Sequence, residues 1–117
     1  MILVVDDDND RREAIAELIK MSGHNVQSAI HGKDALEMLL KTSEKPKLIL
    51  LDLMMPVMNG WEFMTEIKRL PQFADIPILV VSALDDTKLT QLGAKVEVLK
   101  KPIDIPLLLK NLAKYEA

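Results

Sequence analysis

The sequence predicts an α/β fold in which one parallel sheet carries helices on both of its faces. Short apolar runs that favour strands alternate with segments of helical spacing, and this strand-helix pair repeats five times. Such alternation is typical of a parallel sheet, because right-handed crossovers place a helix over each face. The length of 117 residues suits one domain and the 49% apolar content suits one ordinary core, with no linker or internal repeat.

The strands are predicted from five short runs of residues. The stronger four, in chain order, are Ile2–Val5, Leu48–Leu51, Ile78–Val81 and Val96–Leu99, the last interrupted by Glu97. The first three runs are apolar at every position, as expected of strands buried on both faces of a parallel sheet. A weaker run, Val26–Ile30, follows Gly23 and is expected nearer an edge of the sheet.

One helix is predicted after each strand. The first begins at Asp8 or Asn9, since either side chain can cap it, and ends at Gly23. The second helix runs from about Lys33 to Lys41, and the third from about Gly60 to before Pro71. The fourth runs from about Asp85 to Leu92, and Gly93 closes it. The fifth begins at about Pro106, a favourable first-turn residue. Four helices carry apolar stripes that we expect to be buried: Ala14, Ile15, Leu18 and Ile19; Ala35, Leu36, Leu39 and Leu40; Trp61, Met64, Ile67 and Leu70; Leu108, Leu109 and Leu112.

Polar residues directly follow four of the predicted strands. They are Asp6-Asp7-Asp8, Asp52, Ser82 and Lys100-Lys101-Pro102. Taken singly, an acidic run is often only a solvated helix start, a serine only a cap and a lysine only a surface residue. Ligands of open α/β sheets bind outside the carboxyl ends of the strands. These residues are therefore expected to meet at the carboxyl-terminal edge of the sheet, here called the rim. Their coincidence there favours a functional site.

The residue types at this rim indicate phosphoryl chemistry. Clustered carboxylates have raised pKa values unless a cation offsets their repulsion, and oxygen ligands without histidine or cysteine favour Mg²⁺. An aspartate can be the nucleophile in phosphoryl transfer, while a lysine, a hydroxyl and a metal stabilise the transferring oxygens. The sequence therefore predicts a phosphorylated aspartate.

The chain resembles the receiver domains of two-component response regulators over essentially its whole length. The resemblance rests on four motifs in order: Val4-Val5-Asp6-Asp7-Asp8, Leu50-Leu51-Asp52-Leu53-Met54-Met55-Pro56-Val57-Met58-Asn59-Gly60, Val81-Ser82-Ala83 and Lys100-Lys101-Pro102. It implies a five-stranded, doubly wound, flavodoxin-like (βα)5 fold with strand order 2-1-3-4-5. It also implies a single receiver domain over residues 1–117 with no output domain, resembling the stand-alone chemotaxis type.

The resemblance assigns a metal site. Asp52 would be the phosphoacceptor and also a ligand of Mg²⁺. Asp7 would bind the ion directly, Asp6 would hold it mainly through water, and the backbone carbonyl of Met54 would be a further ligand. Asp8 lies beyond the usual pair and is expected to cap the first helix.

The resemblance also assigns residues around the phosphoryl group. Lys101 would pair with that group, and its bond to Pro102 is expected to be cis. Ser82 would follow the phosphoryl group inward and draw the loop after the fourth strand with it. Gly60 would allow a tight entry into the third helix.

Three features depart from the usual receiver pattern or bear on its tuning. Receivers usually carry an aromatic residue at the place of Val98, and the stretch from Ser82 to Lys101 is shorter than usual by about one helical turn. Both features affect how phosphorylation would be read out. Met54 and Leu84 occupy the places that commonly tune hydrolysis, and because both are apolar we expect a long-lived acyl phosphate.

Composition restricts the partners. A net charge of −3 argues against direct nucleic-acid binding. The absence of cysteine excludes disulfides, and no apolar run approaches the roughly 20 residues needed for membrane insertion. A cytoplasmic protein is expected, with a sensor histidine kinase or phosphotransfer protein as phosphodonor and another protein as downstream target. His24 and His31 are expected at the surface.

Three alternatives stay open beside this reading. The domain could dock to partners without being phosphorylated. Val98 and the shortened stretch before Lys101 leave this possibility open, whereas the retained site residues argue against it: Asp6, Asp7, Asp52, Ser82 and Lys101. Asp6-Asp7-Asp8 loosely matches the nucleophile motif of haloacid-dehalogenase-type phosphatases, although Asp10 stands where that family has Thr or Val. A flavodoxin-like cofactor binder is disfavoured, because the chain has one Trp, one Tyr and no glycine-rich phosphate loop.

Overall fold

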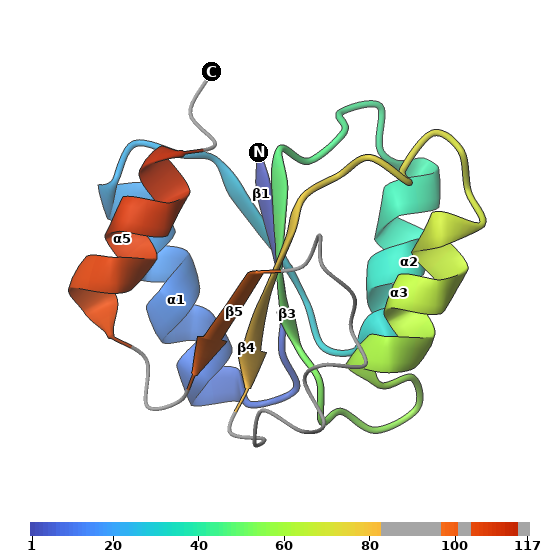
Figure 1. Cartoon of the computed structure of the whole chain (residues 1–117), viewed down its shortest axis with the longest axis horizontal. Helices are drawn as coiled ribbons and strands as arrows, with labels where there is room; N and C mark the ends of the chain where they lie inside the picture. The colour runs from blue at the N-terminus through green and yellow to red at the C-terminus, as the bar shows by residue number, and fades with distance from the viewer. Residues whose placement is uncertain (83–96, 101–103, 115–117) are drawn as a thin grey trace.

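Five parallel strands form one sheet in the order β2-β1-β3-β4-β5, which confirms the predicted fold class and strand order. The computed structural model describes residues 1–82, 97–100 and 104–114 (Figure 1). The strands are β1 (Ile2–Val5), β2 (Val26–Ala29), β3 (Leu48–Asp52), β4 (Ile78–Ser82) and β5 (Glu97–Lys100). The weaker run does form an edge strand, and β3 lies at the centre of the sheet.

The described helices cover both faces of the sheet. They are α1 (Asn9–Met21), α2 (Gly32–Lys41), α3 (Gly60–Lys68) and α5 (Ile105–Ala113). Helices α1 and α5 lie on one side and α2 and α3 on the other (Figure 1). The helix predicted at 85–92 lies outside the described residues.

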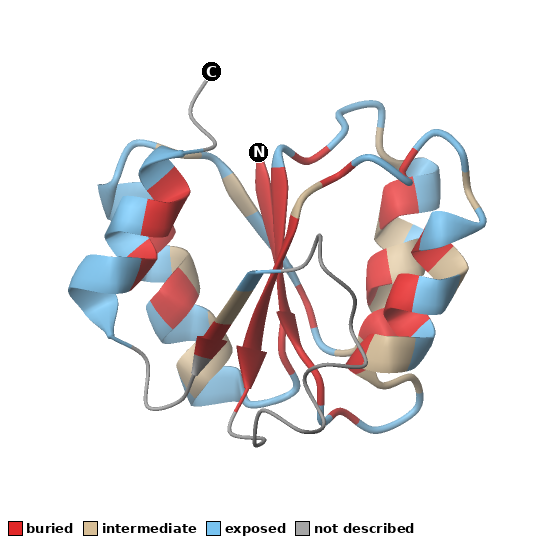
Figure 2. Cartoon of the chain, viewed as in Figure 1, coloured by how far each residue is buried: buried red, intermediate tan, exposed pale blue. Residues whose placement is uncertain are grey.

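Two apolar clusters hold these layers together, because successive residues of a strand point to opposite faces. Leu3, Val5 and Leu51 belong to the cluster beneath α2 and α3. Ile2 and Val4 belong to the cluster beneath α1 and α5. Figure 2 shows the central strands buried along their length, with mixed burial on the helices. Burial of each such aliphatic side chain contributes roughly 1.5–3 kcal/mol to the free energy of folding.

The predicted helix stripes are confirmed in part. Each described helix buries a pair four residues apart: Ile15 and Ile19, Ala35 and Leu39, Phe63 and Ile67, Leu108 and Leu112. Ala14, Leu40 and Leu109 are exposed, contrary to prediction, and Phe63 was missed. Periodicity marks the apolar side of a helix, but the way the helix lies on the sheet decides which flanking positions are covered. Met64 is buried as predicted, whereas Leu40 lies in solvent.

Caps define the helix starts. The Asp8 side chain accepts a hydrogen bond from the Arg11 backbone N–H at 3.0 Å, which confirms Asp8 as the cap of α1. His31 was predicted to be a surface residue but is half-buried, and its Nδ1 accepts from the Asp34 backbone N–H at 3.1 Å. That histidine therefore begins α2, a role more usual for a serine or aspartate. His24 is also only half-exposed.

Candidate functional site

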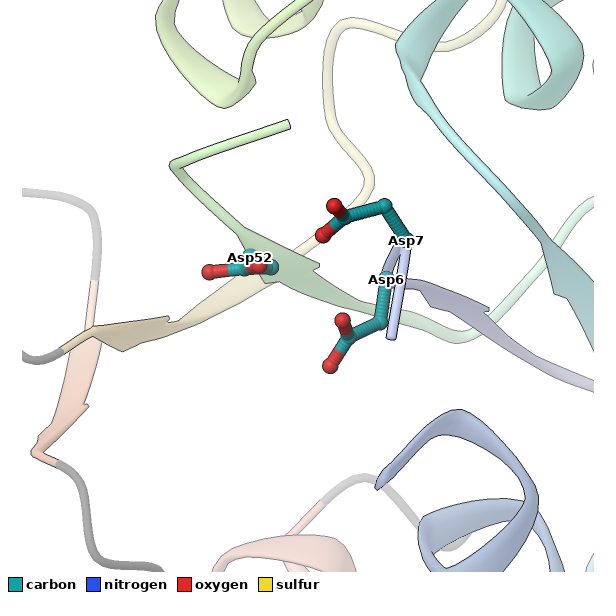
Figure 3. A group of neighbouring side chains, drawn as sticks. All are labelled: Asp6, Asp7 and Asp52. Carbon is teal, nitrogen blue, oxygen red and sulfur yellow. The ribbon is translucent and has the colours of Figure 1, made fainter. Parts of the chain in front are cut away.

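Three carboxylates meet where the central strands end. Asp6 and Asp7 follow β1, Asp52 is the last residue of β3, and one carboxylate oxygen from each lies within 4.8 Å of the others. Figure 3 shows the three side chains extending from neighbouring strand ends into a common space. The juxtaposition follows from strand register, since Val5 lies opposite Leu51, so both strands end at the same height.

The fold buries two of these carboxylates. Asp6 is 3% exposed and Asp52 is 4% exposed, whereas Asp7 lies in solvent. Burying a charged carboxylate costs several kcal/mol unless a partner compensates for the lost water. The two buried carboxylates therefore require a positively charged partner.

Arg11 supplies positive charge from the first turn of α1. Its Nε donates to Asp6 Oδ2 at 2.6 Å, and its Nη2 donates to Asp6 Oδ1 at 2.9 Å. The same Nη2 donates to Asp52 Oδ2 at 3.3 Å. Hydrogen bonding to Asp6 and the charges of Asp6, Asp52 and Asp8 raise the pKa of the Arg11 guanidinium, and partial burial opposes them.

Sequence reasoning missed Arg11. A signal was present, because a basic residue in the first turn of a helix is disfavoured by the helix dipole unless acidic groups lie nearby. The sequence carries two adjacent arginines, Arg11 and Arg12, and only the direction of α1 decides which one reaches the carboxylates. Arg12 instead donates to the backbone carbonyl of Asp6 at 3.0 Å and to Asn9 Oδ1 at 2.6 Å.

Asp6 is held in a fixed orientation. In addition to the two bonds from Arg11, its Oδ1 accepts from the Asp8 backbone N–H at 2.9 Å. Its own backbone N–H donates to the Ala29 carbonyl at 3.1 Å, continuing the link between β1 and β2. The rim is therefore preorganised on the β1 side.

The β3–α3 connection brings backbone close to Asp52. The Gly60 N–H donates to the Leu53 carbonyl at 2.9 Å. A Cβ atom on Gly60 would lie 2.8 Å from the Asp52 carbonyl oxygen and 2.7 Å from Leu53 Cδ2, so only glycine fits there without a shift. This close approach matches the tight helix entry predicted for Gly60. Met54 lies in the same loop, two residues after Asp52, with its side chain exposed.

The remaining predicted site residues are only partly described. Ser82 is buried at the end of β4, and its neighbour Val81 lies opposite Asp52 in the register, so Ser82 is one residue nearer the rim. Lys100 lies opposite Ser82 at the end of β5. Lys101, Pro102 and Leu84 lie outside the described residues. Within the described part of the chain, no helix is long and apolar enough to span a membrane.

The chain matches a family model described as the response regulator receiver domain over residues 2–113. It is similar to a cyclic di-GMP phosphodiesterase of Thermotoga maritima, with 37% identity over 92% of this chain and 28% of that protein. It is also 35% identical to the transcriptional regulatory protein CpxR homolog of Haemophilus influenzae, over 88% of this chain and 44% of that protein. The chain thus spans less than half the length of these curated relatives.

Solved structures extend the similarity to three dimensions. The chemotaxis protein CheY4 of Vibrio cholerae superposes with a TM-score of 0.86 at 29% identity, covering 98% of this chain and 97% of that one. The receiver domain of the Francisella response regulator 1452 gives a TM-score of 0.83 at 28% identity, covering 97% and 93% of the two chains.

Proposed function

The chain belongs to the response regulator receiver domain family, the phosphoacceptors of two-component systems, and from this premise we propose that Asp52 accepts the phosphoryl group. The observation that supports this most strongly is the position of Asp52. It is a buried carboxylate that ends the central strand, within 4.8 Å of two further carboxylates.

In the proposed reaction a carboxylate oxygen of Asp52 attacks the phosphorus of a partner's phosphohistidine or of a small phosphodonor. The new oxygen–phosphorus bond forms as the bond to the leaving group breaks, and the leaving group takes the electron pair. The product is an acyl phosphate on Asp52. Neighbouring residues must then neutralise the negative charge that arrives with the phosphoryl group.

We propose that Asp6, Asp7, Asp52 and the backbone carbonyl of Met54 hold Mg²⁺. The donors fit this ion, since they are all oxygen atoms and the carboxylates converge within 4.8 Å. The family resemblance implies that Asp7 would bind the ion directly and that Asp6 would act mainly through water. The side chain of Asp7 is exposed and therefore accessible to an ion from solvent. When bound, the ion supplies charge compensation to the transferring oxygens.

Ser82 and Lys101 complete the proposed site. A hydroxyl at the end of β4, one strand from Asp52, is suited to donate to a phosphoryl oxygen. Lys101 would pair with another of those oxygens, and its cis bond to Pro102 stays a prediction. The domain would catalyse only its own phosphorylation and dephosphorylation.

Receiver domains interact with histidine kinases or phosphotransfer proteins. We propose that such a partner donates the phosphoryl group in the cytoplasm and that the phosphorylated domain then binds a downstream protein. Neither direct nucleic-acid binding nor membrane insertion is part of this proposal.

A second candidate function is docking without phosphorylation, and Val98 favours it. Val98 is half-buried and packs against the cluster beneath α2 and α3. The family resemblance implies an aromatic ring at this place that swings inward as Ser82 moves, and a valine has no such ring. If this candidate is right, Asp52→Asn will leave the affinity for a downstream partner unchanged.

The phosphoacceptor proposal is tested by incubating the protein with acetyl phosphate and Mg²⁺ and measuring its intact mass. We expect one added phosphoryl group in the parent, none in Asp52→Asn and none after chelation of the metal. Incorporation into Asp52→Asn at the parental rate would refute the assignment.

A further inference from the structure

Arg11 donates hydrogen bonds to two of the carboxylates that the proposed metal site needs. Its guanidinium contacts both carboxylate oxygens of Asp6, at 2.6 and 2.9 Å, and one oxygen of Asp52, at 3.3 Å. Two of the three clustered carboxylates are therefore engaged by a side chain of this protein. Asp7 remains exposed beside them.

The contact is specific to Arg11. It is a two-pronged pairing between a planar guanidinium and a carboxylate that is 3% exposed, the geometry in which arginine binds carboxylates most strongly. The adjacent Arg12 bonds to a backbone carbonyl and to Asn9 instead. Arg11 therefore binds a buried carboxylate and is not merely a solvent-exposed residue in the first turn of a helix.

A guanidinium and a metal ion cannot both be close to these carboxylates without repelling each other. Like charges at contact distance repel, and a divalent ion repels a guanidinium more strongly than a monovalent ion would. The Arg11 side chain is still 28% exposed, so it has a route outward into solvent.

We infer that Arg11 is a built-in counter-ion that competes with Mg²⁺ for Asp6 and Asp52 and withdraws when the metal binds. The inference rests on the proposed metal site and adds a determinant of its affinity. Arg11 stabilises the metal-free domain by pairing with its buried carboxylates, and by the same contacts it weakens metal binding. The two effects are linked, because a group that binds only the metal-free state must raise the dissociation constant for the metal.

The competition is tested by comparing Arg11→Gln with Arg12→Gln. The two variants lose the same charge from adjacent positions, but only the first loses contact with the carboxylate oxygens. Calorimetric titration gives the dissociation constant for Mg²⁺, and thermal unfolding without metal gives the stability of the metal-free form. Both readouts are independent of phosphorylation.

We expect Arg11→Gln to bind Mg²⁺ about tenfold more tightly than the parent, and Arg12→Gln to change affinity by no more than about twofold. Without metal, Arg11→Gln should unfold at a lower temperature, and saturating Mg²⁺ should recover most of that loss. Arg11→Lys keeps the charge but loses the two-pronged contact, so its affinity should fall between those of parent and Arg11→Gln. It also serves as the test if Arg11→Gln fails to fold.

Equal or weaker Mg²⁺ binding in Arg11→Gln and Arg11→Lys, with binding intact in the parent, would overturn the inference and leave the metal site standing. Absence of binding in the parent and in every variant would overturn the metal site as well.

Discussion

Two residues at the rim are subject to opposing requirements, burial and charge. Asp6 and Asp52 are buried and so lose the hydration of a charged carboxylate, yet their proposed roles require charge. Arg11 resolves this conflict in the metal-free protein by pairing with both. Asp7 needs no such partner, because water already solvates it. The site is thus built to hold charge before any ligand arrives.

Asp7 offers a clean test of the metal site because its side chain is exposed. A ligand that binds only the folded state stabilises it, by about 2.7 kcal/mol at a concentration one hundred times its dissociation constant. We expect Mg²⁺ to raise the free energy of unfolding of the parent in this way. The same titration of Asp7→Asn should show little gain, while its stability without metal stays close to that of the parent. An equal gain in both proteins would remove Asp7 from the site.

Val57, in the loop after Asp52, has a φ of +68° although it is β-branched. A Cβ atom in this left-handed region costs about 1–2 kcal/mol, and glycine avoids that cost. Val57→Gly should therefore stabilise the domain by about 1 kcal/mol in urea unfolding. Val57→Ala keeps the Cβ atom and is the matched control, expected to gain much less. The side chain is 71% exposed, so loss of packing should contribute little to the change in unfolding free energy of either variant.

Each described helix packs on the sheet through a buried pair of residues four apart, and burial sets which positions matter for stability. In α2 the buried member Leu39 is 2% exposed and its neighbour Leu40 is 61% exposed. Leu39→Ala should cost about 2–5 kcal/mol of unfolding free energy, whereas Leu40→Ala should cost under about 0.5 kcal/mol. Similar losses for the two variants in chemical denaturation would contradict this difference in burial.

The start of α3 positions the loop beside Asp52. Gly60→Ala would force a Cβ atom to within 2.8 Å of the Asp52 carbonyl oxygen, and such overpacking typically costs about 1–3 kcal/mol. We expect that loss together with slower phosphorylation from acetyl phosphate, because the strand end would shift. Thr65→Ala, on the exposed side of the same helix, should leave both the stability and the rate near parental values. Unchanged stability in Gly60→Ala would show that the loop can move at no cost.

At the scale of the whole molecule, the strands were predictable from sequence and the helix faces only in part. Buried parallel strands read as continuous apolar runs, so β1, β3 and β4 were recognisable directly. Helical periodicity marks the apolar side of a helix but does not show which edge positions of that side the sheet covers, which is why Leu40 and Leu109 were misassigned.

The candidate site was predictable to the extent that it depends on strand ends. Asp6, Asp7 and Asp52 were expected to converge because parallel strands end at one edge, and they do. Arg11 could not be predicted in the same way, since its reach depends on the angle at which α1 leaves β1. The order of the strands places β3 at the centre, so the residue that ends it is enclosed by both neighbours.

The central claim is that Asp52 carries the phosphoryl group, and locating the modified residue tests it most directly. Treating the phosphorylated protein with borohydride reduces an acyl phosphate on an aspartate to homoserine, which peptide mass spectrometry then locates in the sequence. We predict homoserine at position 52 and unmodified aspartate at positions 6 and 7. Homoserine at position 6 or 7, or none in a protein that has gained a phosphoryl group, would contradict the account.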